Sequence, residues 1–443
     1  MLPAHDPRTA VEWDAWLDAR GVTRTDCIAL PLTGDAASAA ALLALLERRQ
    51  SLLLWRQALD AGSLSTLPPW CSHALCGGAD GFTLLPCAAQ GAGTGCVYIA
   101  TSGSTGVPKF AVFTHDALLG NARNCIGRLQ LTADDRVLIP VPVAHMYGLG
   151  AAFLPATLAG AQVRQVPGAN LVRYLEAEAE FEPTVAFLTP SLAHLLVKGR
   201  KRARPYRLTV LAGDRAGESL FHDYERRHGC TVNLYGSTEL GAIAAGSPQD
   251  DFAARSSGAG LPLPGVRLVS PGAAGEAFPL RIEHPFGFAG YAAEDGRPLQ
   301  PPMSSDDVGW PTQDLGRLDA GGRLQLLGRV DHSAKRDGLL VAFGDIERAL
   351  VRVRGIDNAV VVPGGATRRG IELVAICTST ARPAPTAVEI ARALRATLPA
   401  HATPDRFVFV DALPLTATAK PDRVALGALV AVPLEERADA APR

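Results

Sequence analysis

A run of small hydroxyl residues and glycines, closed by a lysine, is the first segment that could bind an anion. It reads Thr101-Ser102-Gly103-Ser104-Thr105-Gly106-Val107-Pro108-Lys109 and follows the apolar stretch 97–100. Glycine lets backbone N–H groups turn toward an anion, hydroxyls donate further hydrogen bonds, and the lysine adds positive charge. The order differs from that of a Walker A loop. A Ser- and Gly-rich stretch is often only a flexible turn, but this full order predicts a phosphate-binding loop, here named the anion loop.

Four further segments follow the anion loop and carry charged or aromatic side chains. They are Tyr235-Gly236-Ser237-Thr238-Glu239, the turn 257–265, the pair of segments 314–319 and 328–331, and the stretch 414–423 around Lys420. In type and in order, from about residue 97 to 425, the five segments resemble the motifs of acyl-CoA synthetases, nonribosomal-peptide adenylation domains and luciferases. The sequence is thereby identified as a member of this adenylate-forming superfamily.

The resemblance implies that the protein joins a carboxylic acid to the α-phosphate of ATP and releases pyrophosphate. Two anions must approach each other, so the site needs positive charge and a metal ion. Lys420 matches the lysine that bridges the substrate carboxylate and the α-phosphate. Glu239 matches the carboxylate associated with Mg²⁺, a hard cation that prefers oxygen ligands. Thr238 is expected to donate to a phosphate oxygen.

The resemblance also implies a nucleotide site. Asp314 would accept hydrogen bonds from the ribose hydroxyls, and Arg329 would reach the ribose or the phosphates. Tyr235 would stack on adenine beside Gly236 and Ser237, although a tyrosine of the core is nearly as well supported. Gly213 aligns with a backbone turn that contacts substrate and adenine.

His145 matches a histidine that lines the acid-binding region in the family. It could gate that region or help to hold the carboxylate. A lone histidine among apolar residues is usually structural, so both interpretations stay open.

The sequence departs from the family pattern at four positions. Asp214 and Gln313 stand where glycine is common, His332 where an acid is common, and Ala419 where glycine precedes the lysine. None of these changes removes a charged group from the expected chemistry. Ala419 could alter the lysine loop, because glycine reaches positive φ more readily than alanine.

The elements that must position these residues alternate between strand and helix, which is typical of a mostly parallel sheet covered by helices. We predict strands at 97–100, 136–143, 185–188, 208–211 and 232–234. We predict a helix or a helix pair at 36–59, and helices at 116–128, 171–180, 191–198 and 220–228. After residue 252, short strands separated by Gly, Pro and Asp indicate a β-rich subdomain. After residue 329 a compact α+β pattern begins.

The predicted fold class is therefore α/β, with a large N-terminal domain at 1–330 and a small mobile α+β domain at 331–443. The resemblance places the hinge near Asp331, and Lys335 and Gly338 on the face used with a thiol acceptor. Two poses make physical sense, because Lys420 must be present for adenylation and must leave before the thiol enters.

Composition and charge exclude several classes of protein. The formal net charge of -1 gives no reason to expect nucleic acid as a general partner. The eight cysteines contain no C-x-x-C pair, which favours reduced thiols in a cytoplasmic protein. The N-terminus lacks the basic and apolar regions of a secretory signal. The apolar stretch 137–163 contains three prolines, so a buried strand and helix explain it better than a membrane span.

The sequence constrains the identity of the substrate and of the acceptor less than it constrains the type of reaction. The short region before Thr101 favours a small acid, and our hypothesis is an aryl acid such as a hydroxybenzoate. The acceptor would be a phosphopantetheine thiol of acyl carrier protein or CoA. The overall pattern resembles compact ligases of aryl-polyene and xanthomonadin-type pigment pathways. Two alternatives remain, a fatty acyl ligase and a non-catalytic nucleotide- or acyl-binding homologue. The oligomeric state is not predicted.

Overall fold

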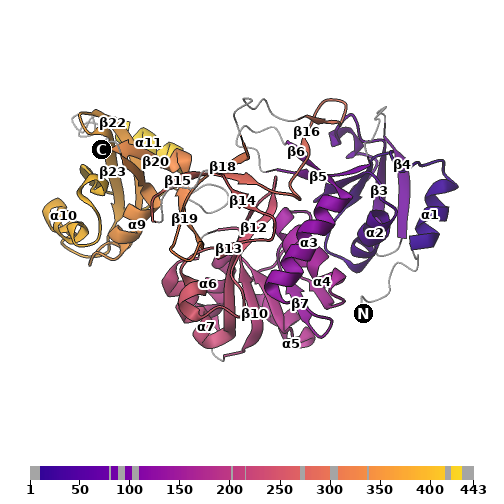
Figure 1. Ribbon diagram of the computed structural model, residues 1–443, viewed down its shortest axis with the longest axis horizontal. Helices are drawn as coiled ribbons and strands as arrows, with labels where there is room; N and C mark the ends of the chain where they lie inside the picture. Colours follow the sequence, from indigo (N-terminus) through magenta and orange to yellow (C-terminus); the bar gives the residue numbers. More distant parts are fainter. Residues whose placement is uncertain are drawn as a thin grey trace, which may run out of the picture. The chain divides into compact units, whose positions relative to one another are not determined.

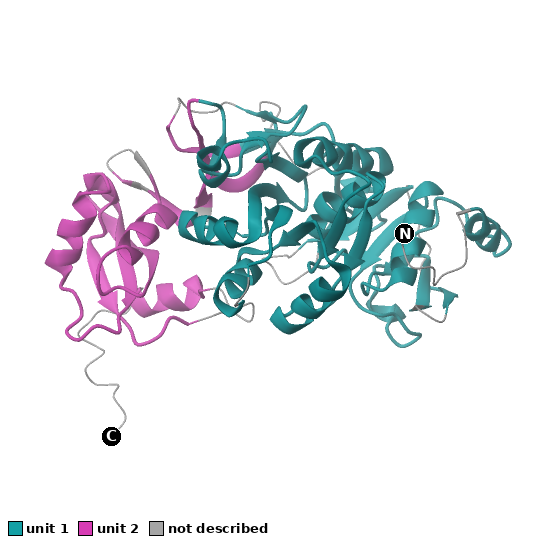
Figure 2. Ribbon diagram, turned by 90° about the horizontal axis from the view of Figure 1, so that it is seen from below, with its two compact units in different colours: residues 1–269, 281–310, 321–325 teal, residues 270–280, 311–320, 326–443 magenta. Residues whose placement is uncertain are grey.

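The computed structural model describes residues 10–78, 81–87, 95–101, 109–200, 203–214, 216–269, 275–299, 308–336, 339–414 and 421–431. Contacts divide the chain into two compact units (Figure 2). Unit 1 comprises residues 1–269, 281–310 and 321–325, and unit 2 comprises 270–280, 311–320 and 326–443. The predicted domain boundary at residue 330 lies inside unit 2.

Among the described residues, the first sheet of unit 1 has eight strands and combines a parallel centre with antiparallel edges. Figure 1 labels several of these strands, among them β5, β6 and β16. β1, β2, β3 and β5 are joined by parallel pairs, whereas β4, β6, β16 and β17 pair antiparallel. In sheet order the strands are β17 (Pro298–Leu299), β16 (Gly290–Ala292), β6 (Phe110–Thr114), β5 (Cys96–Ala100), β2 (Leu52–Trp55), β1 (Ile28–Pro31), β3 (His73–Gly78) and β4 (Gly81–Pro86).

The second sheet of unit 1 has seven strands and is parallel from β8 to β11. Its order is β13 (Leu261–Pro262), β12 (Gly241–Ala245), β11 (Gly229–Ser237), β10 (Tyr206–Leu211), β9 (Val185–Leu188), β7 (Arg136–Ile139) and β8 (Gln162–Gln165). Side-chain caps begin several helices, as when Thr114 accepts a hydrogen bond from Ala117 N–H at the start of α3. The helical segments of unit 1 are α1 (Ala10–Asp18), α2 (Ala36–Glu47), η1 (Leu64–Thr66), α3 (His115–Leu129), η2 (Tyr147–Phe153), α4 (Leu154–Leu158), α5 (Leu171–Phe181), α6 (Pro190–Gly199), α7 (Glu218–His228) and α8 (Phe252–Ser256).

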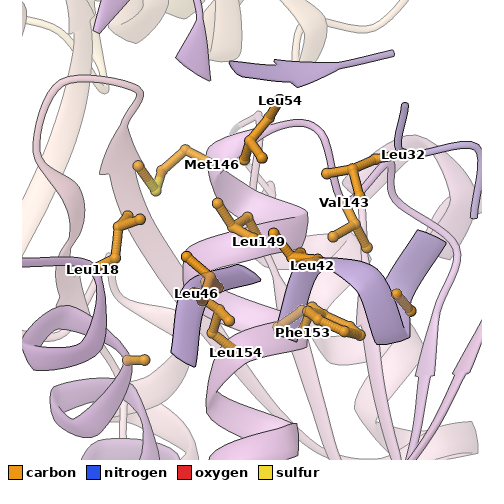
Figure 3. Packing of buried hydrophobic residues seen from close by; sticks show 14 of the residues in the cluster. Leu32, Leu42, Leu46, Leu54, Leu118, Val143, Met146, Leu149, Phe153 and Leu154 are labelled. Atoms are coloured by element: carbon orange, nitrogen blue, oxygen red, sulfur yellow. The ribbon is translucent and has the colours of Figure 1, made fainter. Parts of the chain in front are cut away.

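The largest hydrophobic core lies between one face of each sheet and contains the helices α2, α3, η2 and α4 (Figure 3). Alternation along the strands separates the two faces: Leu54 of β2 joins this core, whereas Leu53 belongs to a cluster on the opposite face of the first sheet. Helices α5, α6 and α7 cover the outer face of the second sheet. Unit 1 is therefore layered, and both sheets turn one face toward a shared layer of helices.

Phe153 lies in this shared core and is 0% exposed. We expect Phe153→Ala to lower the free energy of unfolding by about 3–5 kcal/mol, because a buried ring is replaced by a cavity. Leu158 is 46% exposed at the end of α4. The control Leu158→Ala should therefore change stability by less than about 1 kcal/mol. Urea unfolding followed by circular dichroism measures both variants, and equal losses would contradict the assigned core.

Unit 2 contains a five-stranded sheet with helices of its own. The sheet order is β21 (Leu339–Ala342), β20 (Ser333–Arg336), β23 (Gly370–Thr378) and β22 (Asn358–Thr367), and β24 (Arg406–Phe409) also pairs with β23. The buried Arg336 is held by Asp405, 2.6 Å away, and by the carbonyl of Thr403. The helical segments are η3 (Val330–His332), α9 (Phe343–Val351), α10 (Ala387–Arg395), η4 (Ala400–Ala402) and α11 (Arg423–Ala431). A four-stranded sheet contributes residues to both units, in the order β14 (Arg267–Leu268), β15 (Phe278–Glu283), β18 (Trp310–Leu318) and β19 (Leu324–Arg329).

The predicted α/β class is confirmed, with its alternation of strands and helices and its β-rich segment after residue 252. One element was predicted wrongly. The expected helix at 36–59 ends at Glu47, where Arg49 takes a left-handed φ of 59°, and the remaining apolar residues form β2. The apolar stretch 137–163 forms β7, η2, α4 and the start of β8, and none of the helices in the described parts of the chain is long and apolar enough to cross a membrane.

Candidate active site

The anion loop begins where β5 ends. Thr101 N–H donates to the Lys109 carbonyl across 2.8 Å, so the two ends of the loop are joined where β5 ends and β6 begins. Lys109 is exposed and directly precedes β6. The other loop residues, Ser102, Gly103, Ser104, Thr105 and Gly106, lie outside the described residues. The strand that precedes the loop is as predicted, and the binding of phosphate by the loop remains a prediction.

The second motif forms the turn between β11 and β12. Thr238 and Glu239 lie in this turn, after the end of β11 at Ser237. The buried Asn121 of α3 fastens the turn through its side-chain amide, which lies 3.3 Å from the carbonyls of Leu240 and Ala242. Ala242 N–H returns a hydrogen bond to the Asn121 oxygen. Because both sides of the amide are used, the turn has one defined position relative to α3.

Glu239 is linked to the end of the anion loop through Tyr291 of β16. The Tyr291 hydroxyl donates to Glu239 Oε1 across 2.8 Å. The Lys109 ammonium lies 5.4 Å from the centre of the same tyrosine ring, within the range of a cation–π contact. Burial, with the charge and hydrogen bond of Glu239, raises the pKa of Tyr291. The phenol therefore stays protonated at neutral pH and keeps donating to the carboxylate.

This arrangement leaves Glu239 able to serve a metal ion. Within the described chain, the Tyr291 hydroxyl is the only side-chain partner of Glu239. Oε2 is therefore unengaged there. Mg²⁺ is commonly held by one or two carboxylates together with substrate phosphates and water. Among the described residues, no three His, Cys, Asp or Glu side chains lie together in a way that could hold a metal ion.

His145 contacts Arg56, which follows β2. Arg56 Nη2 lies 3.0 Å from His145 Nδ1. Arginine only donates, so Nδ1 accepts and the imidazole proton resides on Nε2. Burial and the positive charge of Arg56 lower the pKa of His145 to about 4. At neutral pH His145 is therefore a neutral N–H donor.

The chain around His145 is fixed by its neighbours in sequence. The Tyr147 hydroxyl lies 3.1 Å from the carbonyl of Leu188 and 2.9 Å from that of Val210, so it bridges β9 and β10 near their carboxyl ends. A Cβ on Gly148 would meet the carbonyl of Pro142 at 2.2 Å, so this tight approach requires glycine. The π-helical turn η2 starts here, a feature frequent at functional sites.

Three other predicted residues lie near the carboxyl ends of β10 and β11 in the second sheet. Gly213 is exposed just after β10 and has a φ of 86°, which explains glycine at this turn. Tyr235 of β11 is buried, 7% exposed. A stacked adenine and a core role for Tyr235 both remain compatible with this burial. Gly236 is exposed at the end of the same strand.

Asp314 and Arg329 are brought together in unit 2. The Arg329 guanidinium lies 3.6 Å from Asp314 Oδ1 and donates to the carbonyl of Thr312 across 3.3 Å. Thr312 also accepts, through its hydroxyl, a hydrogen bond from Asp314 N–H. The pair presents a carboxylate and a guanidinium from adjacent strands, β18 and β19, as a ribose-binding role would require. That role remains a prediction.

Gln313, the residue before Asp314, has a backbone conformation that favours glycine. This conformation explains why glycine is common at this position in the family. Gln313 is exposed and takes a left-handed φ of 64°, which costs a non-glycine residue about 1–2 kcal/mol. Gln313→Gly is expected to raise the free energy of unfolding by about 0.5 kcal/mol, and Gln313→Val to lower it by about 1–2 kcal/mol. Urea midpoints test this pair. A valine variant as stable as the glycine variant would show that the backbone is not strained.

Lys420 and Gly338 lie outside the described residues. The backbone of Asp331 belongs to η3, and that of Lys335 to β20. The hinge, the thiol face and the lysine contact remain predictions. The structure adds three residues that the motifs missed, namely Tyr291, Arg56 and Asn121. Each reaches the site through a contact between distant segments, so their spacing in the sequence carries no signal.

Comparisons with known proteins agree with the motifs. Residues 84–279 match a family model described as AMP-binding enzyme, and residues 345–420 match the AMP-binding enzyme C-terminal domain. A nonribosomal peptide synthetase, CymA of Salinispora arenicola, is 33% identical over 74% of this chain and 4% of its own length. The indoleacetate–CoA ligase of Aromatoleum aromaticum is 30% identical over 72% of this chain and 64% of its own length. The chain thus spans less than two thirds of either relative.

Solved structures extend the likeness to almost the whole fold. ATP-bound MatB from Rhodopseudomonas palustris superposes with a TM-score of 0.73 at 20% identity, covering 95% of this chain and 92% of that one. The anthranilate CoA ligase AuaEII, in complex with anthranoyl-AMP, gives a TM-score of 0.73 at 19% identity, covering 95% and 90%. At this identity the comparison shows a shared fold.

Proposed function

Since this chain belongs to the superfamily of adenylate-forming enzymes, we propose that it activates a small carboxylic acid with ATP. An oxygen of the acid attacks the α-phosphorus, the bond to pyrophosphate breaks, and an acyl-adenylate forms. A phosphopantetheine thiol then attacks the acyl carbon, loses its proton and displaces AMP. The protein is thus an AMP-forming acid–thiol ligase.

The observation that carries this proposal is the link between the two ATP motifs. Tyr291 donates to Glu239 and lies beneath the ammonium of Lys109. A carboxylate for Mg²⁺ and a lysine for phosphate are therefore held on one scaffold, as a bound nucleotide triphosphate requires. Thr238, in the same turn as Glu239, is suited to donate to a phosphate oxygen.

The remaining roles follow from family membership. Asp314 and Arg329 bind the ribose, Tyr235 flanks adenine, and Gly213 contacts the nucleotide through its backbone. Lys420 bridges the acid and the α-phosphate. The C-terminal part of the chain turns about Asp331 to bring Lys420 to the site and then to remove it.

His145 is suited to hold the acid rather than to remove a proton. Its Nδ1 accepts from Arg56, and its Nε2 carries a hydrogen. A histidine in this state donates a hydrogen bond and offers no free lone pair to a thiol. We therefore assign His145 to acid binding.

An aryl acid such as a hydroxybenzoate is our proposed substrate. Names of relatives support this choice, among them indoleacetate–CoA ligase and the phenyloxazoline synthase MbtB of Mycobacterium tuberculosis. CoA and holo acyl carrier protein are both candidate acceptors.

A screen of pyrophosphate release and thioester formation tests the proposal. Aryl acids, short-chain acids and long-chain fatty acids are each supplied with CoA or with holo carrier protein. We expect a hydroxybenzoate to give the highest kcat/KM and a thioester with at least one acceptor. A preference for fatty acids would reject the aryl assignment while keeping the ligase chemistry.

A further inference from the structure

Arg56 is a cation without an anionic partner in the described structure. It lies beside His145, and no Asp or Glu among the described residues forms an ion pair with it. Burial lowers the pKa of its guanidinium. By contrast, the buried Arg48 of the same unit is paired with Asp14 and Asp18. Arg56 is exposed, whereas Arg48 is buried, so the guanidinium of Arg56 is open to a ligand that supplies a negative or polar partner.

The strand pattern places Arg56 just beyond the end of β2, on the side that Leu54 occupies, where its side chain is exposed. Leu52 and Leu54 belong to the core between the two sheets, whereas Leu53 faces the opposite side. Arg56 is two residues beyond Leu54 and continues the inward side of the strand. Figure 3 shows Leu54 in the same cluster as Met146, the residue next to His145.

The register also places Arg56 level with the start of the anion loop. Leu54 of β2 pairs with Ile99 of β5. Arg56 and Thr101 are each two residues beyond this pair, at the carboxyl edge of the same parallel strands. The guanidinium thus lies at the edge where the proposed ATP site begins, and it touches the histidine assigned to the acid.

We propose that Arg56 selects the substrate, by binding a second oxygen of the acid and by holding His145 as an Nε2–H donor. The inference rests on the proposed function. One guanidinium nitrogen is engaged with His145, and arginine carries five N–H donors in all. The remaining donors are available to a hydroxyl or a second carboxylate. The substrate class is therefore a small acid that carries an oxygen substituent besides the carboxylate that reacts.

Acids with and without a second oxygen distinguish recognition of that oxygen from binding of the reacting carboxylate. Benzoate is compared with 4-hydroxybenzoate, 3-hydroxybenzoate and benzene-1,4-dicarboxylate in pyrophosphate release by wild type, Arg56→Met and Arg56→Lys. For the preferred oxygen-bearing acid we expect Arg56→Met to raise KM by about 10- to 100-fold, the range for a lost hydrogen bond to a charged group. KM for benzoate should rise less, because only the positioning of His145 is lost, and kcat for either acid should stay within about threefold. If Arg56→Lys partly restores KM only for the dicarboxylate, the substituent bound by Arg56 is charged. If it restores KM for a hydroxybenzoate, the substituent is a hydroxyl.

The control is Arg164→Met, since Arg164 lies on the surface in a pair with Glu180. It should leave all four acids unchanged. Equal losses by Arg56→Met on benzoate and on the oxygen-bearing acids would overturn the proposal, because they would place Arg56 on the reacting carboxylate. Wild-type indifference to the second oxygen would also overturn it. Absence of pyrophosphate release with every acid would reject the proposed function itself.

A second readout does not depend on turnover. By NMR the His145 imidazole should titrate at about 4 in wild type, because burial and Arg56 both disfavour the charged ring. In folded Arg56→Met the midpoint should move up toward the usual 6.5, since burial remains and the positive charge is gone. An unchanged midpoint would contradict the positioning role of Arg56.

Discussion

Replacing Lys420 with alanine is expected to slow adenylate formation by about 100- to 1,000-fold, the usual cost of removing one group that stabilises charge in a transition state. The reason is electrostatic. The acid and the α-phosphate are both anions, and the lysine is the cation assigned between them. Acid-dependent pyrophosphate release measures the effect. Lys198→Ala removes an exposed lysine in the last turn of α6 and should leave the rate unchanged.

The second half-reaction makes this prediction sharper. When a synthetic acyl-adenylate is supplied with CoA or carrier protein, Lys420→Ala should form thioester within about threefold of the wild-type rate, because an interaction made only in the first transition state no longer matters. Normal adenylation by Lys420→Ala would refute the assignment of this lysine. Loss of both half-reactions would instead point to a damaged fold, which the thermal midpoint would reveal.

Glu239→Gln is expected to lower adenylation by about 100-fold, because the neutral amide keeps the shape of the side chain but loses the charge that attracts Mg²⁺. The concentration of Mg²⁺ needed for half-maximal rate should rise at the same time. Titration of Mg²⁺ at fixed ATP measures both quantities. A variant with a normal Mg²⁺ dependence would show that Glu239 does not serve the metal.

Tyr291→Phe is the matched control for Glu239→Gln. It removes the hydroxyl that donates to Glu239 but keeps the ring beneath Lys109. The carboxylate retains its charge, so we expect a smaller loss, about 3- to 10-fold, as for one ordinary hydrogen bond. A loss as large as that of Glu239→Gln would show that the orientation of the carboxylate matters as much as its charge.

The fold could be predicted where local patterns determine it. The amphipathic residues of α3, with Asp116 in the first turn, were sufficient to predict that helix almost to its ends. The segment 36–59 failed, because a short Leu-rich run does not distinguish a buried helix from a buried strand. The left-handed conformation of Arg49 ends the helix, and β2 forms because Leu52 to Leu54 pair with two neighbouring strands.

The residues of the candidate site also fall into two groups, those that the sequence could predict and those that it could not. Thr101, Lys109 and Glu239 were found because each belongs to a contiguous motif. Tyr291 could not be found, since it is 52 residues from its partner Glu239, and Arg56 is 89 residues from His145. Neither pair has a spacing that predicts contact. Such residues become visible only when the sheets bring their strands together.

The exchange of labelled pyrophosphate into ATP, without any thiol acceptor, tests the central claim most directly. We predict exchange that requires Mg²⁺ and a carboxylic acid, that is fastest with an oxygen-bearing aryl acid, and that falls with Lys420→Ala and Glu239→Gln. Tight binding of ATP with no exchange across aryl, short-chain and fatty acids would contradict this account and would favour a non-catalytic nucleotide-binding protein.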